Sequence, residues 1–202
     1  MFKSPFFWLI LLLLITLIFT AIAPTEAVLG GNARVVYLHG AWVWVALVGF
    51  LAAAAFGFVG LILRREEYHL ASRALGRTAL TFWIMFFPMS LYIMDANWGG
   101  MFFDEPRWRV PFTFAVTGLL LQLGLSLQKP AWASAANIAY AIALFAGMSG
   151  MQSILHPISP VFTSESILIK VFFTGLVLLL GLAGWQVHRI WFSVEKDSAG
   201  IM

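Results

Sequence analysis

Two histidines, His39 and His156, are the residues of this sequence best suited to bind a metal together. His39 lies between Tyr37 and Trp42, and His156 is followed by Pro157. An imidazole in apolar surroundings costs free energy unless its nitrogens find partners. Two imidazoles that reach one iron from opposite sides can act as the axial ligands of a haem. The alternative is that each histidine caps a helix end or bonds a backbone carbonyl.

The segment 95–109 lies between these histidines in the sequence and combines aromatic rings with glycines and charges. It contains Trp98, the pair Gly99 and Gly100, and two arginines, Arg107 and Arg109. Rings offer a flat apolar ligand a stacking surface, glycines allow close backbone approach, and arginines pair with carboxylates as rigid forks. A porphyrin with two propionates would use all three properties. The alternative interpretation is an aromatic belt at a membrane surface, which needs no ligand.

Composition indicates that a membrane surrounds these residues. The chain has 202 residues, of which 61% are hydrophobic and 10% charged, and its mean hydropathy is +0.91. Soluble domains carry roughly 25% charged residues. The apolar residues form long uncharged runs, and runs of about 18 or more are typical of membrane-spanning helices. The basic residues are scattered, so we expect no nucleic-acid surface, and the absence of cysteine excludes disulfides and thiolate-ligated metals.

The apolar runs, of which the sixth contains Lys170 near its start, predict an all-α integral membrane protein, a single domain over residues 1–202 with six transmembrane helices. Pro88 falls inside the third run, where we expect a kink. The first run resembles a secretory signal but is longer than a usual signal core, so we expect it to be retained as a signal anchor. The predicted spans are Phe6–Ala23, Val35–Leu63, Thr78–Met94, Val110–Leu127, Ala131–Gly150 and Ile167–Val187.

The distribution of Lys and Arg predicts the orientation of the chain. If the N-terminus is cytoplasmic, the inner segments hold eight basic residues and the outer segments hold four. This excess favours an arrangement with both termini in the cytoplasm. Three outer segments follow from it, residues 24–34, 95–109 and 151–166. His39 lies near the outer end of the second span and His156 just after the fifth, so the two histidines are expected on the same outer face.

The residues at this outer face resemble those of the haem-handling membrane proteins of cytochrome c maturation, whose signature is a tryptophan-rich outer loop, the WWD motif. The six-helix CcmC type is the most similar. Its outer histidine stretch is similar to residues 37–42, and its second outer histidine is similar to Leu155-His156. Its loop has the same length as the stretch from Trp98 to Arg107. The family's later tryptophans fall on residues 102 and 104 and its aspartate falls on residue 105, so the chain looks like a divergent branch.

The resemblance implies binding and release of a cofactor, without catalysis. Haem b would lie at the outer face of the cell inner membrane, with His39 and His156 as its iron ligands. A haem chaperone or an apocytochrome would receive it, and an ABC-type exporter or other membrane subunits would work beside the chain. No bond is made or broken by this type alone, so we expect no enzyme. The other residues that the resemblance implies are Trp98, Phe102 and Phe103 for ring stacking, Arg107 and Arg109 for the propionates, and Arg34 as a weaker candidate.

Three other functions stay open at this point. A cytochrome b-like electron-transfer subunit would use a second histidine pair, His69 and His188, on the inner face, although His69 is expected in a solvated loop among charged residues. A structural subunit of a larger membrane complex could keep the fold without haem, and the altered loop motif favours this alternative. A small-solute transporter is disfavoured, because transporters usually place polar or broken-helix sites near the midplane and the mid-span residues here are nearly all apolar.

Overall fold

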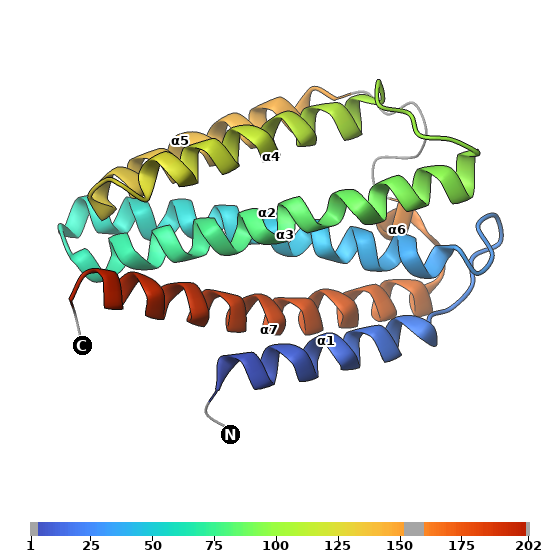
Figure 1. Ribbon diagram of the computed structural model, residues 1–202. Helices are drawn as coiled ribbons and strands as arrows, with labels where there is room; N and C mark the ends of the chain where they lie inside the picture. Colours follow the sequence, from blue (N-terminus) through green and yellow to red (C-terminus); the bar gives the residue numbers. More distant parts are fainter. Residues whose placement is uncertain (1–3, 152–159, 201–202) are drawn as a thin grey trace.

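The computed structural model describes residues 4–151 and 160–200, and it is an all-helical bundle (Figure 1). Five long helices form most of the bundle, and two others are shorter: α1 has 17 residues and α6 has four. The helices are α1 (Pro5–Ala21), α2 (Ala33–Leu63), α3 (Glu66–Trp98), α4 (Pro106–Leu125), α5 (Pro130–Ser149), α6 (Pro160–Thr163) and α7 (Ile167–Ser198).

Five of these helices, α2, α3, α4, α5 and α7, are long and apolar enough to cross a membrane. The prediction of a multi-pass, all-α membrane protein is therefore confirmed. The remaining predicted span, Phe6–Ala23, corresponds to α1, which has 17 residues and so measures about 25 Å at 1.5 Å per residue, less than the ~30 Å hydrocarbon core. Phe19 of α1 stacks on Phe172 of α7 with ring centroids 4.4 Å apart. The count of six spans, and with it the orientation of the termini, stays a prediction.

The antiparallel pair α2 and α3 forms the centre of the bundle, with α4 and α5 on one side and α7 and α1 on the other (Figure 1). The turn between α2 and α3 consists of two residues, and Arg64 adopts the left-handed conformation there, with φ 54°. Small residues let the two helices approach closely. A Cβ added at Gly49 of α2 would lie 2.9 Å from the Cβ of Ala79 on α3, so any larger residue at this position would push the central pair apart.

The third helix is much longer than the predicted span of residues 78–94, because it begins at Glu66 and ends at Trp98. The expected solvated loop after Arg65 is therefore wrong, and so is the expectation that His69 is solvated. His69 is buried, and its Nδ1 lies 2.7 Å from the hydroxyl oxygen of Ser134 on α5. The physical reason is that polar side chains in this part of α3 find partners on neighbouring helices, which removes the cost of burying them.

Prolines interrupt two helices without ending them. Pro88 lies inside α3 on its exposed side, and Pro111 lies inside α4. The helix continues past each proline although the proline nitrogen cannot donate a hydrogen bond. The indole nitrogen of Trp83 donates to the carbonyl oxygen of Pro111 at 3.0 Å, and this bond joins α3 to α4 at the level of the second proline.

The turn between α1 and α2 contains a carboxylate whose protonation we expect to be measurable. Glu26 Oε2 accepts hydrogen bonds from the backbone N–H of Leu29 at 2.9 Å and of Val28 at 2.8 Å, and these bonds lower the pKa of Glu26 below its ordinary value. The bonds form with the charged carboxylate. Their contribution to the turn is therefore complete above the ordinary glutamate pKa and is lost as pH falls through the lowered one.

The first prediction is that a carboxyl ¹³C NMR titration gives Glu26 a pKa below the ordinary glutamate value. The variant Glu26→Gln should lack this titrating signal, which identifies it. A pKa at or above the ordinary value would show that the two backbone bonds do not form in solution.

Candidate functional site

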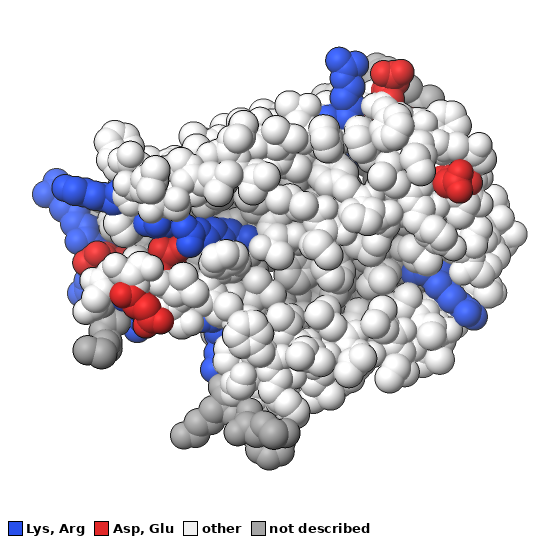
Figure 2. Space-filling view, in the orientation of Figure 1, with Lys and Arg blue, Asp and Glu red and all other residues white. Residues whose placement is uncertain are grey.

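The charged residues divide the bundle into two unlike ends. We call one of them the basic end, and Figure 2 shows its basic side chains at the left. The opposite end, the aromatic end, contains residues 22–34 and 95–109 and the start of α7. The basic end is defined by Arg64, Arg65, Arg73, Arg77, Lys129, Arg189 and Lys196.

The candidate ligand His39 lies near the start of α2, at the aromatic end, and is half-buried. Its ring meets the ring of Phe86 on α3 edge to face, with centroids 5.4 Å apart. One turn further along the same two helices, Trp42 packs against Phe82 at 4.8 Å. The antiparallel pairing of α2 and α3 therefore places His39 in a row of ring contacts between the two helices, at the aromatic end.

Further ring contacts extend this row from α3 to α4, and we call the whole set the aromatic cluster. Phe86 contacts Phe87 at 4.1 Å, and Phe87 contacts Trp108 at 5.9 Å. Trp108 also stacks on Phe112 at 4.9 Å and meets Phe103 edge to face at 5.0 Å. A continuous set of ring contacts thus connects His39 to the loop between α3 and α4. The aromatic cluster consists of His39, Trp42, Phe82, Phe86, Phe87, Phe103, Trp108 and Phe112.

The predicted site residues of segment 95–109 all lie at the aromatic end, but most of the segment is helical. α3 continues to Trp98, α4 begins at Pro106, and the connection starts with Gly99 at φ 72°. Phe102 and Phe103 lie in this connection and are exposed, while Trp98 is half-buried at the end of α3. The first turn of α4 carries half-buried Arg107 and exposed Arg109, and exposed Arg34 lies near the start of α2.

Trp108 belongs to the candidate site, although no individual role within segment 95–109 was assigned to it from the sequence. It contacts three rings of the aromatic cluster, and its indole nitrogen is buried without a hydrogen-bond partner among residues 4–151 and 160–200. The hydroxyl of Tyr37 and the indole nitrogen of Trp42 are buried in the same way at this end of the described chain. A buried donor that lacks an acceptor costs about 1–3 kcal/mol. The spacing of Trp108 and Phe112, one helical turn apart, was the sequence signal that could have identified this residue.

The second predicted ligand, His156, lies outside the described residues, but the helices that flank its segment are described. α5 ends at the aromatic end, and α6 begins at Pro160. Phe162 of α6 meets Trp44 of α2 edge to face at 5.7 Å and Phe173 of α7 at 5.8 Å. Both flanks of the segment therefore lie at the end of the bundle that carries His39.

The described residues fit a haem in part. A half-buried imidazole beside a row of aromatic rings suits an axial ligand next to a flat apolar macrocycle, and the buried indole nitrogens of Trp42 and Trp108 are donors that suit a ligand with carboxylates. Among residues 4–151 and 160–200, no group of three or more His, Asp or Glu side chains gathers to hold a metal ion.

The other histidine pair, His69 and His188, does not come together in the described contacts. His69 bonds Ser134 on α5. His188 is buried on α7, where its ring lies 5.2 Å from that of Trp185 and 5.6 Å from that of Phe192. The geometry therefore gives no support to a second bis-histidine site at the basic end.

The scan against models of protein families and the search of curated proteins both gave no match. The functional interpretation therefore depends on the residues and contacts described above.

Proposed function

We propose that this chain is a haem-binding membrane protein that holds haem b at the aromatic end and passes it on during cytochrome c biogenesis. The observation that carries the proposal is the position of His39 at one end of a continuous aromatic cluster. A flat apolar macrocycle can stack on these rings and bury much of its apolar surface against them. The flanks of the segment that contains His156 lie at the same end, which favours a second axial ligand from that segment.

Each site residue has a role in this proposal. His39 and His156 ligate the iron, and the rings of Trp98, Phe102 and Phe103 contact the macrocycle. Arginines pair with the two propionates as bidentate donors, and the resemblance assigns this role to Arg107 and Arg109. Phe102 and Phe103 are exposed, so they hold haem weakly enough for release. Release rather than catalysis is the function, and the chain is not an enzyme.

The proposed setting is the cell inner membrane. Seven described basic residues lie at the basic end, and four, Arg34, Arg107, Arg109 and Lys170, lie at the aromatic end. This excess favours a cytoplasmic location for the basic end. The aromatic end then faces outward, where a haem chaperone or an apocytochrome would receive the haem. An ABC-type exporter or other membrane subunits are the proposed neighbours.

The second prediction tests the ligand assignment. His39→Ala and His156→Ala should each change the absorption spectrum of bound haem from a six-coordinate, low-spin form, because each removes one axial ligand. The detergent-purified protein should contain one haem per polypeptide. His69→Gln serves as the control, since it keeps a polar side chain opposite Ser134 and lies at the other end of the bundle, and its spectrum should be unchanged.

Each alternative function has a distinct result in the same experiment. Two haems per polypeptide would indicate the electron-transfer subunit, and a colourless protein that does not take up added haem would indicate the haem-free structural subunit. Unchanged spectra for both His39→Ala and His156→Ala would show that other residues ligate the iron. Transfer is tested separately, by adding apomyoglobin to the haem-loaded protein and following the shift of the haem absorption band.

A further inference from the structure

Two arginines and one glutamate form a buried ionic cluster at the basic end. The side chain of Glu195 on α7 is 2% exposed and lies between Arg73 and Arg77 of α3. Its Oε2 atom is 3.1 Å from Arg73 Nε, and its Oε1 atom pairs with Arg77. Two guanidinium groups and one carboxylate leave one positive charge in excess inside the protein. An excess charge at this depth is costly unless an anion or a water-filled path compensates it.

The excess belongs to Arg77 rather than to Arg73. In addition to its ion pair with Glu195, Arg73 donates to the carbonyl oxygens of Ser126 at 3.2 Å and Gln128 at 3.3 Å. Ser126 is the C-cap of α4, at the end where the helix dipole is negative, and Gln128 lies in the turn that follows. Arg77 has Glu195 as its one acceptor in the described part of the chain, and its guanidinium lies over the ring of Trp191 at 5.2 Å. Arg77 therefore retains donors for one more anion.

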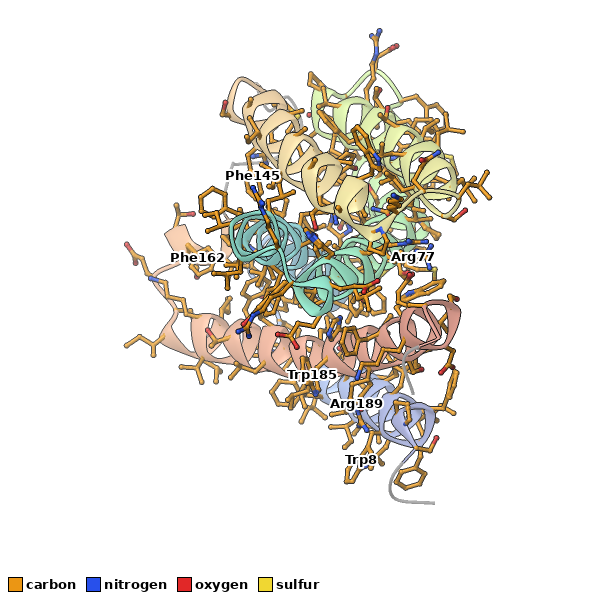
Figure 3. The ribbon with its side chains drawn as sticks, turned by 90° about the vertical axis from the view of Figure 1, so that its left-hand side faces the viewer. Trp8, Arg77, Phe145, Phe162, Trp185 and Arg189 are labelled. Atoms are coloured by element: carbon orange, nitrogen blue, oxygen red, sulfur yellow. The ribbon has the colours of Figure 1, made fainter. Side chains whose placement is uncertain are left out.

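Arg77 lies at one end of an uncovered stripe along α3, which we call the open face of α3. The other sides of this helix are covered: Phe86 packs on α2, Trp83 bonds α4, and Phe82 lies beside Gly184 of α7. Figure 3 shows Arg77 at the side of α3, with α4 above it and α7 below. The open face consists of Arg77, Thr81, Met85, Pro88 and Tyr92, which lie on one side of the helix with Thr81 and the residues after it exposed.

The length of the open face matches the thickness of one leaflet of a bilayer, and its change from charged to apolar matches that from headgroup to acyl chain. Arg77 and Pro88 are eleven residues apart, which corresponds to about 16 Å along a helix, and one leaflet contributes about half of the ~30 Å hydrocarbon core. The stripe is charged at Arg77 and becomes apolar at Met85, whose side chain is 52% exposed. Tryptophan beside a basic residue, as with Trp191, is typical of the interfacial level of a membrane.

We propose that an anionic phospholipid of the leaflet at the basic end binds along the open face of α3, with its phosphate on Arg77 and an acyl chain against Thr81, Met85 and Pro88. Charge complementarity selects this occupant. The site offers a single excess cation at headgroup depth followed by an apolar stripe, which matches one lipid. A transmembrane helix from a partner would need an acidic side chain at the level of Arg77 to make the same match.

The test compares two lipids that differ only in headgroup charge. The full-length, delipidated protein in detergent is titrated with phosphatidylglycerol and with phosphatidylcholine of the same acyl chains, and binding is followed by native mass spectrometry. We expect the native chain to bind phosphatidylglycerol at least tenfold more tightly. Arg77→Gln should reduce this preference to about twofold or less. The fold should survive, because Arg73 still pairs with Glu195.

Two controls separate this site from general attraction to a basic surface. Arg65→Gln removes an exposed arginine that pairs with exposed Glu67, and this variant should keep the full preference for phosphatidylglycerol. Arg77→Lys keeps the positive charge and should keep most of the preference. Thr81→Trp should weaken binding of both lipids by filling the stripe. Equal binding of the two lipids by the native chain, or a preserved preference in Arg77→Gln, overturns the proposal. Association of two chains that Thr81→Trp abolishes would also overturn it, in favour of a helix as occupant.

Discussion

Replacing Glu195 by alanine is expected to lower the free energy of unfolding by about 3–5 kcal/mol, because it leaves the buried guanidinium of Arg73 and the partly buried guanidinium of Arg77 without their carboxylate. Glu195 is buried and pairs with Arg73 and Arg77. The same ion cluster joins the C-terminal part of α7 to α3 and, through the backbone bonds of Arg73, to the turn after α4. Its loss should therefore loosen three elements together. Unfolding of the detergent-solubilised protein by titration with sodium dodecyl sulfate measures the effect.

Glu67→Ala is the matched control for this prediction. Glu67 also pairs with an arginine, Arg65, at 3.5 Å, but both side chains are largely exposed. Exposed pairs contribute about 0.2–1 kcal/mol, so the control should change stability little. Arg77→Gln should likewise cost much less than Glu195→Ala, since it leaves one cation and one anion. Equal losses in Glu195→Ala and Glu67→Ala would show that the ion cluster is hydrated rather than buried.

The class of the fold could be predicted from the sequence, but the extent of the helices could not. Long uncharged runs indicate membrane-spanning helices because a helix pairs its backbone groups within its own segment, as lipid requires. The run that contains Trp83 was found, whereas the turns of α3 that contain His69 and Arg73 were assigned to a solvated loop. Their partners Ser134 and Glu195 are distant in the sequence, and hydropathy does not detect such pairings.

The end of the bundle that carries the candidate site could be predicted from the sequence, but the contacts between its residues could not. Basic-residue counting and helix order placed His39 and segment 95–109 at the same end, and the structure has both there. The residues that connect them, Phe86, Phe87 and Trp108, were not identified. Which side of a transmembrane helix faces its neighbour depends on packing, and in a run that is apolar all round there is no amphipathic pattern to show it. The open face of α3 was missed for the same reason.

Trp83→Ala is the second change expected to have a large effect, a loss of about 3–5 kcal/mol in the free energy of unfolding. Trp83 is fully buried, with 0% of its surface exposed. It contacts Phe50 of α2 edge to face at 5.9 Å and Phe86 at 5.1 Å, and it donates to Pro111 on α4. Lipid is as apolar as the protein interior, so the loss comes from van der Waals contacts and the remaining cavity rather than from hydration.

Two further variants divide this effect into its parts. Trp83→Phe keeps most of the ring contacts and loses the bond to Pro111, so it should cost about 0.5–1.5 kcal/mol for that bond. Trp132→Ala removes an indole that is 63% exposed, and a surface change of this kind should cost about 0.5 kcal/mol or less. If Trp83→Ala cost no more than Trp132→Ala, α3 and α4 would not be packed through Trp83. Because Trp83 also contacts Phe86, which packs beside His39, haem occupancy in Trp83→Ala should be measured alongside its stability and is expected to fall with it.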